Sequence, residues 1–96
     1  MKDRILSNQF IEKLLINTEV DEKEYVELCD ILRKLAVEWK DEKYIEKEIV
    51  NLLYQIPVIV RNKYLFYSDK GYSNATIDRL EDMWIELDGL ILECLS

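Results

Sequence analysis

Carboxylates are the residues of this chain whose type and spacing could do chemistry. Of its 96 residues, 20 are Asp or Glu and 13 are Lys or Arg, and the surplus lies in segments 19–30 and 75–95, each with six acids and one base. The acids recur at three-residue steps in the first segment and four-residue steps in the second, at Asp21, Glu24, Glu27 and Asp30 and at Asp78, Asp82 and Glu86. On a helix, such like-charged neighbours repel each other by about 0.2–0.5 kcal/mol per pair. The spacing therefore predicts a negative field directed at a basic partner, with solvated helix faces as the alternative.

Two acid pairs have the spacing of a magnesium site. Glu24-x-x-Glu27 and Asp78-x-x-Glu81 could project from facing helices, and Mg²⁺ prefers oxygen ligands. This spacing resembles the carboxylate pairs of the helical nucleoside-triphosphate pyrophosphohydrolases, and the resemblance implies a Mg²⁺-dependent nucleotide hydrolase. The same spacing also arises by chance in a chain that is one-fifth acidic, and these acids flank the apolar stripes instead of interrupting them. A hydrolase is therefore the alternative to a protein-binding function.

Other catalytic groups are missing from the sequence. The chain has no histidine, which is the commonest general base and metal ligand. Its two glycines, Gly71 and Gly89, stand alone, so no glycine-rich phosphate loop can form. Cys29 and Cys94 lie far apart in apolar helical stripes, which is typical of small core residues, with a redox or ligand role as the alternative. We therefore expect a protein that is not an enzyme and uses no cofactor and no metal.

Nucleic acid and membrane are unfavourable partners for this sequence. Polyanion recognition needs clustered bases, whereas the bases from 33 to 47 are interleaved with acids. No apolar run approaches the ~18 residues that span a bilayer, and the basic N-terminus lacks the apolar core of a signal peptide. We expect a cytoplasmic protein that binds neither nucleic acid nor membrane, and the sequence leaves its oligomeric state open.

Tyrosines are unusually frequent, with six in the chain. Tyr64, Tyr67 and Tyr72 stand between residues 61 and 74, where the helical pattern fails. Because protein interfaces favour tyrosine as an anchor, we predict that these three rings contact a partner. Packing of the rings beneath a loop is the alternative.

The sequence predicts that helices position these side chains. Apolar residues recur at three-to-four spacing, most clearly at Leu28, Leu32 and Leu35, and the predicted helices span 7–16, 21–40, 41–56 and 75–94. Pro57 removes a backbone hydrogen bond, so we expect the third helix to end or kink near 55–56 and a short helix to run from Pro57 to Val60. Residues 61–74 should then form a helix end and an ordered loop. The sequence predicts an all-α fold, a single domain of residues 1–96, in which four main amphipathic helices and a short helix after Pro57 form a compact bundle.

The second half of the chain also carries a family resemblance. Residues 44–67, YIEKEIVNLLYQIPVIVRNKYLFY, and residues 84–95, WIELDGLILECL, resemble the small helical immunity proteins of bacterial contact-dependent growth inhibition toxin systems. The resemblance lies in overall pattern, so it transfers no functional residue. It implies a cytoplasmic, non-enzymatic protein that neutralises one toxin domain, often a nuclease.

The charge pattern and the resemblance lead to one expected function. We predict an inhibitor that covers the active site or substrate groove of a basic protein, most plausibly a nuclease toxin, since such a surface must hold phosphates. The acids predicted to contact it are Asp78, Asp82, Glu86 and Glu93, with a second candidate surface at Glu24, Glu27 and Asp30. A helical structural module that only self-associates is a further alternative.

Overall fold

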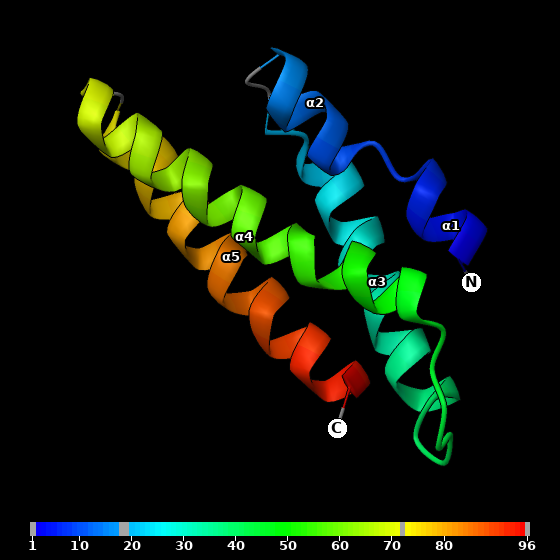
Figure 1. Ribbon diagram of the computed structural model, residues 1–96. Helices are drawn as coiled ribbons and strands as arrows, with labels where there is room; N and C mark the ends of the chain where they lie inside the picture. Colours follow the sequence, from blue (N-terminus) through cyan, green and yellow to red (C-terminus); the bar gives the residue numbers. More distant parts are fainter. Residues whose placement is uncertain (1, 18–19, 72, 96) are drawn as a thin grey trace.

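The computed structural model describes residues 2–17, 20–71 and 73–95, and this part of the chain contains helices and no strands (Figure 1). The predicted all-α fold is therefore confirmed. The helices are α1 (Lys2–Ser7), α2 (Phe10–Asn17), α3 (Glu22–Glu38), α4 (Lys47–Lys70) and α5 (Asn74–Leu95). None of these described helices is long and apolar enough to cross a membrane.

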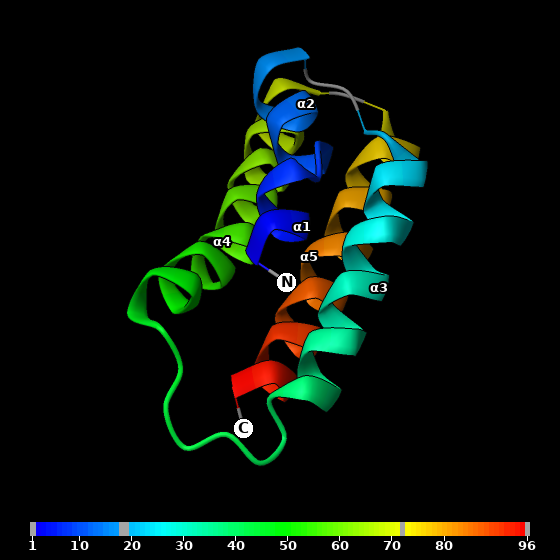
Figure 2. The ribbon, with the colours of Figure 1, turned by 90° about the vertical axis from the view of Figure 1, so that its right-hand side faces the viewer.

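The long helices α4 and α5 run antiparallel and side by side over most of their length (Figure 1). Figure 2 shows α3 packed beside α5, while α1 and α2 follow one another along the opposite side of the bundle, between α3 and α4. Since α1 and α2 form one interrupted helical layer, the arrangement is that of a four-helix bundle. One side of the α4–α5 pair faces the core, and the other is turned away from every other helix.

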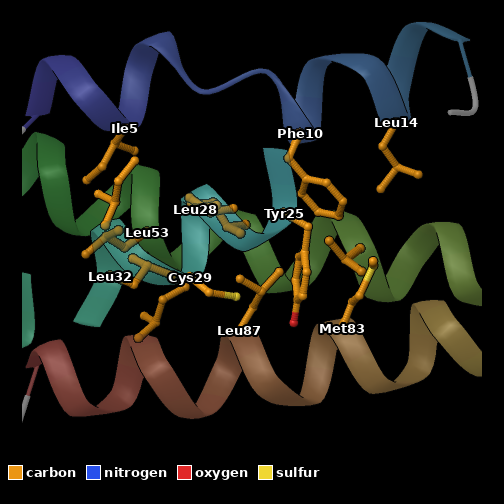
Figure 3. Close-up of a cluster of buried hydrophobic side chains, with 14 of the residues drawn as sticks. Ile5, Phe10, Leu14, Tyr25, Leu28, Cys29, Leu32, Leu53, Met83 and Leu87 are labelled. Carbon is orange, nitrogen blue, oxygen red and sulfur yellow. The ribbon is translucent and has the colours of Figure 1, made fainter. Parts of the chain in front are cut away.

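The core is formed by apolar side chains from every helix. In α3, Leu28, Leu32 and Leu35 are at most 1% exposed, which confirms the predicted stripe. Figure 3 shows Tyr25 reaching from α3 toward α5, with the ring of Phe10 packed against it from α2 at a centroid distance of 5.3 Å. The bundle is thus held together by burial of these stripes, at about 25 cal/mol per Å² of apolar surface.

Side-chain caps set the starts of three helices. Asp21 accepts a hydrogen bond from the Glu24 backbone N–H at 3.1 Å, and Ser73 accepts one from Thr76 N–H at 3.3 Å, as expected for N-caps. Asn8 accepts from Phe10 N–H at 3.0 Å and so begins α2. Asn8 lies just before α2, while the short helix α1 was not predicted.

The chain around Pro57 confirms the predicted kink and contradicts the elements predicted after it. Instead of ending there, α4 continues to Lys70, so the separate short helix after Pro57 and the loop at 61–74 are both wrong. Pro57 leaves one backbone carbonyl of the previous turn without its helical donor, but the helix buries Leu53, Val60 and Tyr67 on either side of it. Figure 2 shows the first turns of α4 inclined to the rest of the helix, so the proline bends it. Burial of Leu53, Val60 and Tyr67 in the core therefore outweighs the cost of the backbone hydrogen bond that is lost at Pro57.

The irregular connection lies earlier, at residues 39–46. The prediction began a helix at Asp41, but the structure begins α4 at Lys47. Residues 40–44 are all exposed, because the sequence there is almost entirely charged and offers no side chain to bury. At its other end α4 stops at Gly71, whose φ of 74° is the left-handed conformation that glycine favours.

Gly89 offers a test of the α5 assignment. It lies exposed inside α5, and a Cβ atom added to it would meet nothing within 4 Å. We expect Gly89→Ala to raise the free energy of unfolding by about 0.5–1 kcal/mol, because glycine loses more backbone entropy than alanine in a helix. In thermal unfolding followed by circular dichroism, the midpoint should rise by about 2–8 °C. Gly71→Ala is the control and should lower it, since φ there is positive; a midpoint lowered by Gly89→Ala would contradict the open geometry.

Candidate functional site

The outer side of α5 carries an acidic surface. Asp78, Asp82 and Glu93 are exposed, and their spacing places them on the side of the helix opposite its buried stripe. We call these three residues the α5 acidic face. Asp78 and Asp82 form no ion pair with any residue that the structure describes. This part of the predicted contact surface therefore points to solvent.

Glu86, although also on α5, is turned toward α3. One of its carboxylate oxygens accepts a hydrogen bond from the Tyr25 hydroxyl and lies 3.8 Å from the Cys29 Sγ, and the other is 3.9 Å from Arg33 Nη2. Burial raises the pKa of Tyr25, and the hydrogen bond to this carboxylate raises it further. Glu86 is thus engaged between the two helices, but its side chain is 47% exposed, and its contact with a partner stays a prediction.

Arg79 was not singled out from the sequence, yet this residue of α5 contacts two residues of α3. We call this contact region between the two helices the α3–α5 seam. The guanidinium of Arg79 donates from Nε and Nη2 to the two carboxylate oxygens of Glu22, both at 2.7 Å, and lies 5.0 Å from the Tyr25 ring centroid. The hydrogen bond from Arg79 lowers the pKa of Glu22. Its signal in the sequence was its isolation, because it is the one base in segment 75–95. With Arg79 engaged by Glu22, α5 has no free base to offset its acids.

The second predicted surface, on α3, is mostly engaged within the molecule. Glu24 accepts hydrogen bonds from Asn8 Nδ2 at 3.1 Å and from the Gln9 N–H at 3.3 Å. Asp30 pairs with Lys34 at 3.1 Å. Glu27 is exposed, but Glu24 and Asp30 on either side of it have the polar partners just described. We therefore place the candidate site on α5.

The three predicted tyrosine anchors lie in different surroundings. Tyr67 is 1% exposed, so its ring belongs to the core and the predicted anchor is corrected to a packing residue. Tyr64 is half-buried against α5, where the hydrogen-bonded Glu81 carboxylate raises the pKa of its hydroxyl. Tyr72 lies outside the described residues. Among the tyrosines that the structure describes, Tyr44 and Tyr54 are the exposed ones, at 91% and 68%.

The two acid pairs with magnesium-site spacing face different neighbours. Glu24 points to the break between α1 and α2, whereas Glu81 contacts Tyr64 of α4 and Asp78 is exposed. No cluster of three or more Asp, Glu, Cys or His side chains suited to a metal ion occurs among the residues described. This arrangement gives the hydrolase alternative no support.

An apolar groove, which sequence reasoning missed, runs between the outward sides of α4 and α5. Its volume is about 250 Å³, and Arg61 lies over the Trp84 ring beside it, 5.9 Å from the centroid. The indole N–H of Trp84 is buried without an acceptor among the described residues. We call this hollow the α4–α5 groove, and its lining residues are Tyr54, Pro57, Val58, Arg61, Trp84, Asp88, Ile91, Leu92 and Leu95.

A signal for the groove was present in the sequence. Tyr54, Val58 and Leu92 are apolar residues that fall outside the helical stripes predicted to form the core, and they are 68%, 41% and 61% exposed. Apolar residues off the core stripe, when they come together from two helices, indicate an interaction surface.

Comparison with protein-family models, with curated proteins and with solved structures finds no match for this chain. The resemblance to immunity proteins therefore remains a hypothesis, and function has to be argued from the surfaces themselves.

Proposed function

We propose that this protein binds and neutralises a basic protein partner through the α5 acidic face. One observation carries the proposal: Asp78 and Asp82 project together from α5, unpaired with any described residue, while Arg79 is held by Glu22. Asp21, by contrast, is paired with Lys13 at 2.6 Å. Repulsion between unpaired neighbours is offset when a cationic surface binds them.

The kind of partner follows from the chemistry and from the family resemblance. A nuclease domain presents clustered Lys and Arg for phosphates, and carboxylates placed against them accept charge-assisted hydrogen bonds. Segments 44–67 and 84–95, which resemble the immunity proteins, contribute α4 and α5, the two helices beside the acidic face. We propose a cytoplasmic inhibitor of a nuclease toxin that acts by covering its active site or substrate groove.

The first experiment identifies the partner. The product of the adjacent gene should co-purify with the full chain, should be basic, and should lose its nuclease activity when the complex forms. An adjacent gene product that is acidic, or that does not bind, would contradict the proposed class of partner.

Charge reversal of the α5 acidic face tests the surface. Asp78→Lys with Asp82→Lys should slow association with that partner by about tenfold or more at low salt and much less at high salt, because steering is screened. Stopped-flow fluorescence measures the association rate, with circular dichroism to verify folding.

The matched control is Glu27→Lys with Asp30→Lys, which reverses two exposed charges on α3. If both double variants slow association equally, the effect is one of net charge. If only the α3 variant does, the acidic face has been placed on the wrong helix.

A further inference from the structure

The α4–α5 groove lies beside the α5 acidic face and differs from it in character. The wall that α4 contributes to the groove consists of Tyr54, Val58 and Arg61. The wall from α5 consists of Asp88, Leu92 and Leu95. Four of these side chains are apolar and between 38% and 68% exposed. Each wall residue directly follows a buried residue of its helix, so the walls lie about 100° round each helix from its buried stripe, outside the core. They form an apolar surface ready to bury against another molecule.

The charges of the groove indicate what that molecule is. Arg61 stands on the α4 wall and Asp88 on the α5 wall, and neither forms an ion pair with any residue that the structure describes. A purely basic segment would be repelled by Arg61, and a purely acidic one by Asp88. The groove therefore suits an occupant that carries one charge of each sign at a matching separation.

A second copy of this chain has that pattern. Because α4 and α5 lie side by side (Figure 1), a two-fold axis parallel to them places the α4 wall of one copy over the α5 wall of the other. Arg61 of each copy then faces Asp88 of the other, so the pair is made twice. The exposed Tyr54, Val58 and Leu92 are buried in the same step.

We propose that the α4–α5 groove is the interface of a two-fold dimer, in which the paired α4 and α5 helices of two copies stack face to face. Asp78 and Asp82 remain available, because neither lines the groove and both precede Trp84, where the α5 lining of the groove begins. Each chain carries a net charge of −7, so the dimer should be measured at physiological salt, where repulsion beyond about 8 Å is screened.

The test is the mass of the purified full chain in sedimentation equilibrium from micromolar to millimolar concentration. We expect a monomer–dimer equilibrium, which Leu92→Glu should abolish without lowering the thermal midpoint, because Leu92 is 61% exposed. Val37→Glu is the matched control, being 77% exposed on α3, and should leave the dissociation constant unchanged.

A charge swap tests the pairing itself. Arg61→Asp alone and Asp88→Arg alone should each weaken the dimer by about tenfold or more, because each places like charges opposite one another. The double variant, with the charges exchanged, should return to within a few-fold of the natural chain.

A chain that is monomeric at every concentration would contradict the proposed dimer and would indicate that a different protein binds the groove. A dimer that Val37→Glu weakens as much as Leu92→Glu does, or that the double swap fails to restore, would also overturn it. These outcomes are independent of the proposed function, since none of these variants alters the α5 acidic face.

Discussion

Replacing Tyr67 by alanine is expected to lower the free energy of unfolding by about 3–5 kcal/mol, which is the usual cost of emptying a fully buried aromatic position. The ring is 1% exposed and sits in the last turns of α4. Its loss leaves a cavity, and neighbouring side chains of a close-packed core relax only partly into it. For a domain of this size the thermal midpoint should fall by more than about 12 °C.

Tyr44→Ala is the matched control for this substitution. Tyr44 is 91% exposed in the connection before α4, so its removal should change stability by no more than about 0.5 kcal/mol. Urea unfolding followed by circular dichroism gives both values. If Tyr67→Ala unfolds like the natural chain and loses only partner binding, the ring is an interface anchor, as predicted from the sequence, and not a core residue.

The burial of Tyr67 also shows where sequence reasoning failed for α4. Pro57 argued for a helix end or a kink, of which only the kink occurs, and the aromatic run after it argued for a loop. Both arguments are local, whereas the helix continues because Val60 and Tyr67 bury themselves against the rest of the bundle. By contrast, α3 was predictable, because the Asp21 cap and the apolar stripe at Leu28 and Leu32 gave the same answer.

The candidate site likewise contains residues that could be predicted from local sequence and residues that could not. Asp78 and Asp82 could be placed on one exposed face from their four-residue spacing alone. That Glu86 is used by Tyr25, 61 residues away, depends on how α3 and α5 pack and has no local signature. The groove needed the alignment of two helices, so Val58 and Leu92 stood out only as apolar residues off their stripes.

Raising the pH above 9 is expected to destabilise the fold by about 4 kcal/mol at pH 11, because buried acids of the α3–α5 seam resist ionisation. Burial raises the pKa of the Cys94 thiol from 9.0 to about 11, and its Sγ donates to the Leu32 carbonyl at 3.2 Å. Burial and the Glu86 carboxylate raise the pKa of Tyr25 from 10.0. Burial raises the pKa of Cys29 as well.

The sign follows from which state holds the proton. Below pH 9.0 both states keep the Cys94 proton, and the stabilisation is fully present. Between pH 9.0 and about 11 the unfolded chain releases it and the folded chain does not, so stability falls by about 1.4 kcal/mol per pH unit. From pH 10.0 upward the Tyr25 phenol adds a second loss of the same slope.

Urea unfolding across this pH range measures the loss, and two variants separate the groups. Cys94→Ala should make the loss between pH 9 and 11 shallower, leaving the contributions of Cys29 and Tyr25. Tyr25→Phe should cost about 1–2 kcal/mol near neutral pH, where its hydrogen bond to a charged carboxylate is lost, and should reduce the slope above pH 10 to that of the two thiols.

Tyr44→Phe serves as the control for the phenol, since that ring is 91% exposed and lies outside the groove, so removing its hydroxyl should leave the pH profile as it is. A natural chain whose stability does not change up to pH 11 would mean that these groups reach water in the folded state. Because Tyr25 and Glu86 join α3 to α5, that result would also reopen the position of α5 and of the acidic face that it carries.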